Sequence, residues 1–337
     1  MLKIISPNGI VFPYLNSAKK YLLQGGDVKN FYKNQFEETN QAIPITISWQ
    51  TDENPLSFSI KYGTDKALKL CNSSSVNGNK RQIEVYNLLK SATYYVEIIA
   101  YYDCGKVEKA QSSFKTTDLG PRPLKIDGIY NVRDIGGYTL KNGKKTLQNK
   151  ILRGGTLTPC KDCKDVGLSD SGKAYMSEVL NIKTEIELRS PQEAEQGKVS
   201  AIPKARLVYA TLAGYDAIVD FKEGVIALFN ILADKQNYPV YIHCTGGADR
   251  TGTVCFLINA LLGVDENALI QDYEFTSFSY YGVRSTKSEW TQPLFEKFIG
   301  MLNRFDGNTL SKKVENLLLF IGVSPISIAN LRKIMID

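Results

Sequence analysis

The stretch that decides the fold is residues 240–252, which reads Val-Tyr-Ile-His-Cys-Thr-Gly-Gly-Ala-Asp-Arg-Thr-Gly. It opens with an apolar run typical of a buried strand, and its arginine opens an apolar helical segment. Two glycines lie between them, and glycine lets the backbone curl until successive N–H groups point to one spot. Such a nest at a helix N-terminus binds a tetrahedral anion. The stretch therefore predicts a strand, an anion-binding loop and a helix in succession.

Cys244 and Arg250 are the residues of this anion loop (residues 244–250) that carry chemistry. A guanidinium group can grip two oxygens of a phosphate at once, and the positive helix terminus favours a cysteine thiolate. A nucleophile inside a phosphate cradle suits phosphoryl transfer to sulfur, followed by hydrolysis of the thiophosphate. We therefore expect Cys244 to be the nucleophile. The expected phosphate-binding residues are Thr245, Gly246, Gly247, Ala248, Asp249 and Arg250.

The leaving alcohol or phenol needs a proton, so the reaction requires a general acid. The segment before the loop offers Asp216, and the loop itself contains Asp249. We expect His243 to be a structural hydrogen-bonding residue that positions the loop and supports the thiolate, rather than a base. Thr251 has two interpretations: its hydroxyl donates to the thiolate, or it simply caps the helix.

The Cys-x5-Arg-Thr loop resembles the signature of the protein tyrosine phosphatase superfamily. Its tail, residues 249–252, is similar to bacterial tyrosine/serine phosphatases of the His-Cys-x-x-Gly-x-Asp-Arg-Thr-Gly type. Further stretches resemble motifs of that family in the same order: Asn-Val-Arg-Asp-Ile-Gly-Gly at 131–137, Leu-Arg-Gly-Gly at 152–155, Ile-Glu-Leu-Arg-Ser at 186–190 and Asp-Tyr at 272–273. The resemblance covers about residues 125–337.

This resemblance implies a metal-independent phosphatase without a cofactor, acting on phosphotyrosine, and on phosphoserine or phosphothreonine, in proteins or on small phosphate monoesters. It favours Asp249 over Asp216 as the general acid, and it implies that Arg133 and Asp134 line or brace the site. Family members often carry lysine where this chain has Ala248. That difference weakens the alternative of a phosphoinositide or inositol-phosphate phosphatase. A non-catalytic phosphate-binding or adhesion protein is a further alternative, but it would not need the nucleophile.

Residues 43–118 follow a different pattern, in which apolar side chains alternate along 45–49, 56–62 and 94–102 between turn-rich segments. The stretch 88–100 resembles the fibronectin type III pattern, where a leucine, a turn and a tyrosine precede an alternating strand. Prolines and a glycine predict a linker at 119–124. Beyond it, strands interleave with helices through residue 337.

The expected fold class is therefore an N-terminal all-β immunoglobulin/fibronectin-like sandwich, followed by an α/β domain like that of tyrosine phosphatases. Residues 1–42 form an N-terminal segment of uncertain structure, within which 17–23 fits a short helix. The sandwich is a candidate for binding another protein or a cell-surface component.

The composition is that of an ordinary globular chain of 337 residues, 43% hydrophobic and 23% charged. The net charge of +6 is spread thinly, which argues against a nucleic-acid partner. No apolar run reaches the roughly 18 residues of a membrane helix. We expect a soluble protein, either exported or at the cell surface with its leader removed, or cytoplasmic.

The six cysteines are too sparse for a disulfide scaffold, and the single histidine excludes a histidine-rich metal centre. Two pairings stay open from the sequence: a disulfide between Cys71 and Cys104, and one between Cys160 and Cys163.

Overall fold

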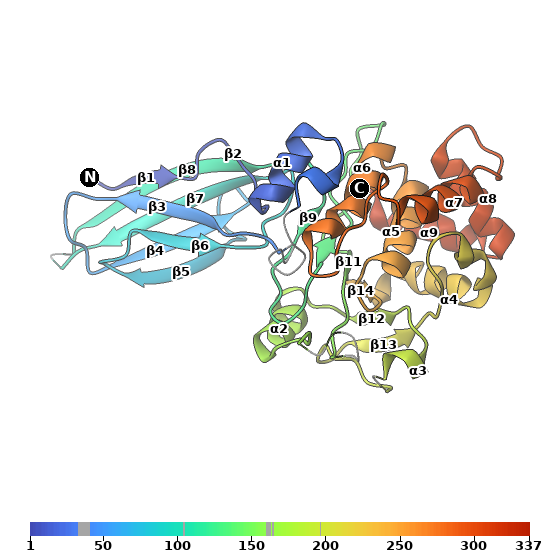
Figure 1. The fold of residues 1–337 in the computed structure, drawn as a ribbon. Coiled ribbons are helices and arrows are strands. Elements are labelled where there is room, and N and C mark those ends of the chain that lie inside the picture. Colours follow the sequence, from blue (N-terminus) through green and yellow to red (C-terminus); the bar gives the residue numbers. More distant parts are fainter. Residues whose placement is uncertain (33–40, 104, 160–162, 164, 196) are drawn as a thin grey trace. The chain divides into compact units, whose positions relative to one another are not determined.

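The computed structural model describes residues 1–32, 41–103, 105–159, 163, 165–195 and 197–337 (Figure 1). The chain divides into two compact units. The first comprises Met1–Pro13 and Ala42–Asp118, and the second comprises Tyr14–Gln41 and Leu119–Asp337.

The first unit is a β-sandwich of two sheets, as the alternating apolar pattern predicts. In the described residues one sheet has the order β1-β3-β6, made of β1 (Lys3–Ser6), β3 (Ile45–Gln50) and β6 (Gln82–Val85). The other has the order β2-β8-β7-β4-β5, made of β2 (Ile10–Val11), β4 (Ser57–Gly63), β5 (Asn72–Asn77), β7 (Thr93–Tyr101) and β8 (Val107–Thr116). Its core includes the fully buried Ile47, Phe58 and Ile98.

A tyrosine at the start of β7 ties the sandwich together in the manner expected from residues 88–100. The hydroxyl oxygen of Tyr94 accepts a hydrogen bond from the Leu89 N–H at 2.8 Å. This is the tyrosine corner found in immunoglobulin-like sandwiches. The fibronectin-like fold class is confirmed, and Met1–Pro13 contributes two strands that the sequence pattern left unassigned.

The second unit contains a mixed sheet with the order β13-β12-β14-β11-β10-β9 in the described residues (Figure 1). Its parallel strands are β13 (Arg206–Tyr209), β12 (Thr184–Glu187), β14 (Val240–His243) and β11 (Ile151–Gly154). The antiparallel strands β10 (Arg133–Asp134) and β9 (Arg122–Pro123) complete one edge. The segment expected to be a linker thus supplies an edge strand, a position that tolerates proline because an edge needs fewer N–H donors.

Helices account for most of the rest of this unit. They are α1 (Asn16–Gln24), α2 (Asp170–Ala174), α3 (Pro191–Ala194), α4 (Lys222–Leu232), α5 (Asp249–Leu262), α6 (Glu266–Phe275), α7 (Gln292–Leu302), α8 (Leu310–Ile321) and α9 (Pro325–Met335). Helix α5 is buried from Thr251 to Leu262, and it ends at Gly263 with a φ of 87°, as its sequence predicts. None of the described helices has the length and apolarity needed to cross a bilayer.

The segment Tyr14–Gln41 belongs to the second unit, although it precedes the sandwich strands in sequence. The Tyr21 hydroxyl donates to a carboxylate oxygen of Glu274 at 2.5 Å, and the ring of Tyr14 packs edge-on against Phe275. A fragment starting after residue 118 would lack these contacts. The second unit therefore extends beyond the expected range of 125–337.

The cysteine pairings are settled only in part. Cys71 is a free thiol and Cys163 is disulfide-bonded. Cys104 and Cys160 lie outside the described residues.

Candidate active site

The anion loop leaves β14, an inner strand of the sheet, and leads directly into α5. Cys244 follows the last residue of β14 and is 6% exposed, and Arg250 lies in the first turn of α5. The helix begins at Asp249, one residue before the arginine that was expected to open it, so the loop ends directly at a helix N-terminus. The carboxyl edge of a parallel sheet is where α/β folds bind ligands.

Three carbonyl groups of the loop are held by donors that surround it. The Thr245 carbonyl accepts from the Thr156 N–H at 2.9 Å, and the Gly246 carbonyl accepts from the Asn131 amide at 2.9 Å. The Gly247 carbonyl accepts from the Arg153 guanidinium at 2.6 Å. In a planar trans peptide the next N–H points opposite to the carbonyl. Fixing these carbonyls outward therefore turns the following N–H groups toward the inside of the loop.

Gly247 is required at its position for two separate reasons. Its φ is +63°, in the left-handed region that favours glycine, and a Cβ there would lie 2.2 Å from the backbone of Gly154. Gly154 is constrained in turn, because a Cβ on it would lie 2.2 Å from the Tyr241 hydroxyl. The close approach explains why this chain has glycine at position 154.

Replacing Gly247 with alanine is expected to weaken binding of inorganic phosphate by about 10–100-fold, the value of one or two charge-assisted hydrogen bonds. The added methyl group must push the loop off Gly154, which tilts its N–H groups. Isothermal titration with phosphate measures the effect. Gly300→Ala in α7 is the matched control, since its added Cβ meets nothing within 4 Å. Equal phosphate affinity in the two variants would contradict the loop geometry.

Beneath the loop, two buried arginines share one carboxylate. Arg133 Nε lies 2.6 Å from one oxygen of Asp272, and Arg153 Nη1 lies 2.5 Å from the other. Burial acts to raise the pKa of Asp272, but the two guanidinium groups hold it below its ordinary value. Because Arg153 also binds the Gly247 carbonyl, this network fixes the loop from below. Arg133, fully buried, braces the site rather than lining it.

Asp134 has a different place from its neighbour in sequence. Its carboxylate pairs with Arg122 of β9 at 2.9 Å and accepts from the backbone N–H groups of Gly136 and Asn149. Burial raises its pKa, although Arg122 opposes this. Asp134 therefore anchors the edge strand β9, and none of these contacts involves the anion loop.

The lone histidine is held between two carboxylates of β12. His243 Nε2 lies 2.9 Å from Glu185 Oε1, and Nδ1 lies 3.5 Å from Glu187 Oε2. Burial acts to lower the pKa of His243, but the two carboxylates raise it above the ordinary value. Arg189 balances the charge by pairing with Glu187 at 2.7 Å. The ring thus anchors the end of β14 to β12, and the expected support of the thiolate is not among its hydrogen bonds.

Arg250 has a counter-ion that the sequence did not indicate. Its Nη1 contacts both carboxylate oxygens of Glu193, on α3, at 2.8 Å. Both side chains are partly exposed, at 31% and 44%. The pair is therefore open to solvent, so an incoming anion can compete with Glu193 for the guanidinium.

Asp249 is tied to two further residues that sequence motifs missed. Arg284 Nε and Nη2 each lie 2.8 Å from a different carboxylate oxygen, and the Tyr215 hydroxyl donates to Oδ1 at 2.7 Å. Burial acts to raise the pKa of Asp249, but Arg284 outweighs it and the pKa is lowered.

The alternative acid, Asp216, follows Tyr215 in the 3-10 helix η3 (Tyr215–Asp220) and is half-buried. The backbone of Tyr215 donates to Thr253 Oγ1 at 2.7 Å. A Cβ on Gly214 would lie 3.2 Å from the Arg250 nitrogen. This segment therefore lies against the N-terminus of α5, which brings both acid candidates to the same corner.

Several buried polar atoms near the loop have no hydrogen-bond partner among the described residues: Thr251 Oγ1, the Tyr281 hydroxyl, His243 Nδ1 and Arg153 Nε. Thr251 is fully buried, and α5 has no side-chain cap bond, so the capping interpretation is not supported. The ring of Tyr281 packs on the loop, since a Cβ on Gly246 would lie 3.0 Å from it.

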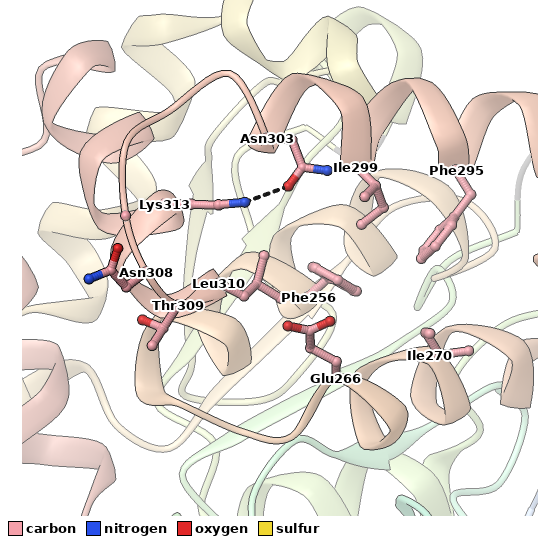
Figure 2. A pocket seen from close by; sticks show the side chains of 11 residues that line it. Phe256, Glu266, Ile270, Phe295, Ile299, Asn303, Asn308, Thr309, Leu310 and Lys313 are labelled. Carbon is pink, nitrogen blue, oxygen red and sulfur yellow. Dashed lines mark hydrogen bonds between the residues drawn. The ribbon is translucent and has the colours of Figure 1, made fainter.

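A separate cavity of about 340 Å³ lies among α5, α6, α7 and α8 (Figure 2). Its floor is apolar, with Phe256, Phe295 and Leu310, and Glu266 and Lys313 contribute charge. None of the expected site residues lines it. In the described part of the chain, no cluster of three or more His, Cys, Asp or Glu side chains is arranged to hold a metal ion.

Comparison with known proteins identifies this architecture. Residues 124–318 match the model described as "Tyrosine phosphatase family". The chain belongs to the tyrosine phosphatase family. The resemblance to tyrosine phosphatases is thereby confirmed over residues 124–318. A family relative named "Putative tyrosine-protein phosphatase", from Cupriavidus necator, is 25% identical over 182 residues, covering 46% of this chain. The match spans 63% of that relative's length.

Solved structures are similar to each half of this tyrosine phosphatase family member. The core catalytic domain of the PP-IP phosphatase SIW14 from S. cerevisiae, in complex with citrate, is 17% identical. It matches 52% of this chain and 88% of its own, with a TM-score of 0.32. The fn3 domain of human collagen alpha-1(XX) is 23% identical over 22% of this chain and 71% of its own, with a TM-score of 0.20.

Proposed function

We propose that this chain is a metal-independent cysteine phosphatase that hydrolyses phosphate monoesters through a phosphocysteine intermediate. The observation that carries the proposal is the anion loop. The carbonyl groups of Thr245, Gly246 and Gly247 accept hydrogen bonds from residues outside the loop. Cys244 follows strand β14, and Arg250 lies in the first turn of α5. A thiol inside a cradle for a tetrahedral anion suits covalent phosphoryl transfer.

In the first step, the phosphate group enters the loop and Arg250 exchanges Glu193 for two phosphate oxygens. The Cys244 sulfur attacks phosphorus, and the bond from phosphorus to the leaving oxygen breaks. The leaving oxygen takes a proton from Asp249, the favoured acid, with Asp216 as the alternative.

In the second step, water attacks the phosphocysteine and the sulfur–phosphorus bond breaks. The same carboxylate accepts the proton of the water, which returns the acid to its starting state. Thr251 supports the departing thiolate, because its buried hydroxyl lacks a partner among the described residues and lies seven residues after Cys244 at the start of α5.

Phosphotyrosine in proteins is the proposed substrate class, with phosphoserine and phosphothreonine as further members. The name of the C. necator relative supports the tyrosine-protein class. Ala248 supports it too, because its buried side chain adds no charge to the loop for the extra phosphates of an inositol phosphate. A phosphoinositide or inositol-phosphate phosphatase is the second candidate.

Turnover of para-nitrophenyl phosphate by the full chain, in the presence of a chelator, tests the proposal. We expect activity that the chelator leaves unchanged, because the mechanism uses only side chains and water. Phosphotyrosine peptides are then compared with phosphoserine peptides and inositol phosphates by their kcat/KM. Phosphate binding without turnover would favour the non-catalytic alternative. Activity lost in chelator and restored by zinc or magnesium would contradict the metal-independent mechanism.

A further inference from the structure

We infer that Arg284 is a positioning residue for Asp249 and that it sets the pH range in which Asp249 exchanges its proton during turnover. The inference rests on the proposed function, since it concerns the acid of that same site. Arg284 lies outside every sequence motif that pointed to the loop.

The contact between the two residues is a bidentate ion pair. Nε and Nη2 of the forked Arg284 guanidinium each lie 2.8 Å from a different carboxylate oxygen of Asp249. This geometry fixes the plane of the carboxyl group as well as its position. The Arg284 side chain is 10% exposed and the Asp249 side chain 37%. The carboxylate therefore remains open on one side while its counter-ion is buried.

Arg284 is itself held rigidly. Its backbone N–H donates to Ser277 Oγ at 2.9 Å, and Ser277 Oγ donates back to its carbonyl at 2.8 Å. Its guanidinium also donates to the Val283 carbonyl at 3.1 Å and lies 4.9 Å from the centre of the Trp290 ring. A cation held over an indole ring is stabilised in its charged form. The arginine is thus a fixed charge, which a positioning role requires.

The charged and titratable groups around Asp249 come from several elements. Arg284 comes from the segment before α7, Tyr215 from η3, Tyr273 from α6, and Arg250 from α5 itself. Tyr215 and Tyr273 share a hydrogen bond between hydroxyls at 3.0 Å, and burial raises the pKa of both, so they stay neutral. The charge acting on Asp249 therefore comes from the two arginines, and only Arg284 contacts its carboxylate.

The direction of the pH effect follows from this charge. A general acid must carry a proton, so activity falls as pH rises through the pKa of Asp249. Arg284 holds that pKa below the ordinary value in the free protein. The alkaline limb of kcat/KM reports the free enzyme, whereas that of kcat reports the substrate complex. A phosphate dianion in the loop favours the protonated carboxyl, so the alkaline limb of kcat lies at higher pH than that of kcat/KM.

Arg284→Met is the test, because methionine fills part of the volume and removes the charge. We expect the alkaline limb of kcat/KM to move to higher pH by about 1–3 units, the usual effect of an adjacent opposite charge. Arg284→Lys keeps the positive charge but loses the forked contact. We therefore expect the alkaline limb of its kcat/KM profile to stay near that of the natural protein, while its kcat falls. Arg304→Met, at an exposed arginine just after α7, is the matched control and should change neither.

A second readout does not depend on turnover. The carboxyl carbon of Asp249, assigned in the NMR spectrum by its loss in Asp249→Asn, is titrated in the natural protein, in Arg284→Met and in Arg284→Lys. We expect its midpoint to rise in the methionine variant. An unchanged midpoint in folded Arg284→Met, or an unmoved alkaline limb of kcat/KM in that variant, would overturn the inference. If Arg284→Met does not fold, Arg284→Gln replaces it, because glutamine also removes the charge but keeps an N–H donor, and a smaller upward shift is expected. Absence of turnover in the natural protein would overturn the proposed function but leave this titration able to test the ion pair.

Discussion

Cys244→Ser is expected to lose nearly all turnover while retaining affinity for phosphate and vanadate. Loss of the nucleophile in covalent hydrolases costs on the order of 10⁵–10⁶-fold in kcat. Serine keeps the shape of the side chain, but its hydroxyl is a far weaker nucleophile than a thiolate. The anion cradle is built from backbone N–H groups and Arg250, none of which the substitution removes. The measurements are steady-state turnover of para-nitrophenyl phosphate and isothermal titration with vanadate.

Cys71→Ser is the matched control, because Cys71 is also a free thiol but belongs to the sandwich unit. Its turnover should equal that of the natural protein. Cys255, a further free thiol among the described residues of that unit, cannot replace Cys244, since burial raises its pKa to about 11 and keeps it protonated. Turnover by Cys244→Ser at the natural rate would rule out the phosphocysteine intermediate.

The strand, loop and helix around Cys244 could be predicted because their signals are local. An apolar run, a pair of glycines and a helical apolar segment stand next to one another in sequence, and Gly263 marks the end of α5. The sandwich strands could be predicted equally well, since the period-two alternation of apolar residues lies within each strand. The start of α5 was predicted to within one residue, because Arg250 was expected to open the helix.

The partners of the loop residues could not be derived in the same way, because they are distant in sequence. Glu193 lies 57 positions from Arg250, and Arg284 lies 35 positions from Asp249. Family motifs pointed to the regions of Asn131, Arg153 and Asp272, but no motif showed that they bind the loop carbonyls and one another.

The assignment of segment 14–41 to the second unit also depends on contacts between residues that are distant in sequence. Its hydrogen bond from Tyr21 to Glu274 spans 253 positions. Nothing in the local pattern of a short helix followed by glycines indicates which of the two units it joins. Only the packing of its aromatic side chains against α6 and the following turn decides this.

Asp249→Asn is expected to lose more activity on substrates whose leaving group must be protonated than on substrates whose leaving group departs as a stable anion. General acid catalysis contributes roughly 10²–10⁴-fold. The loss should approach that range on phosphotyrosine or an alkyl phosphate and be much smaller on an aryl phosphate with an acidic phenol. Because activity requires the protonated carboxyl, the alkaline limb of the pH–rate profile should also disappear. Kinetics with a series of leaving groups, at several pH values, measure both effects.

Asp216→Asn provides the comparison, since the segment that carries Asp216 packs against the N-terminus of α5. We expect a smaller loss, equal for good and poor leaving groups, because Asp216 would then affect only the packing of η3. In the Asp249→Asn variant, Arg284 has lost its charged partner. The folded state of that variant must therefore be verified at the assay temperature. If the two variants exchange behaviour, the acid comes from η3. Asp249, whose lowered pKa keeps it ionised near neutral pH, would then hold Arg284 and orient the attacking water.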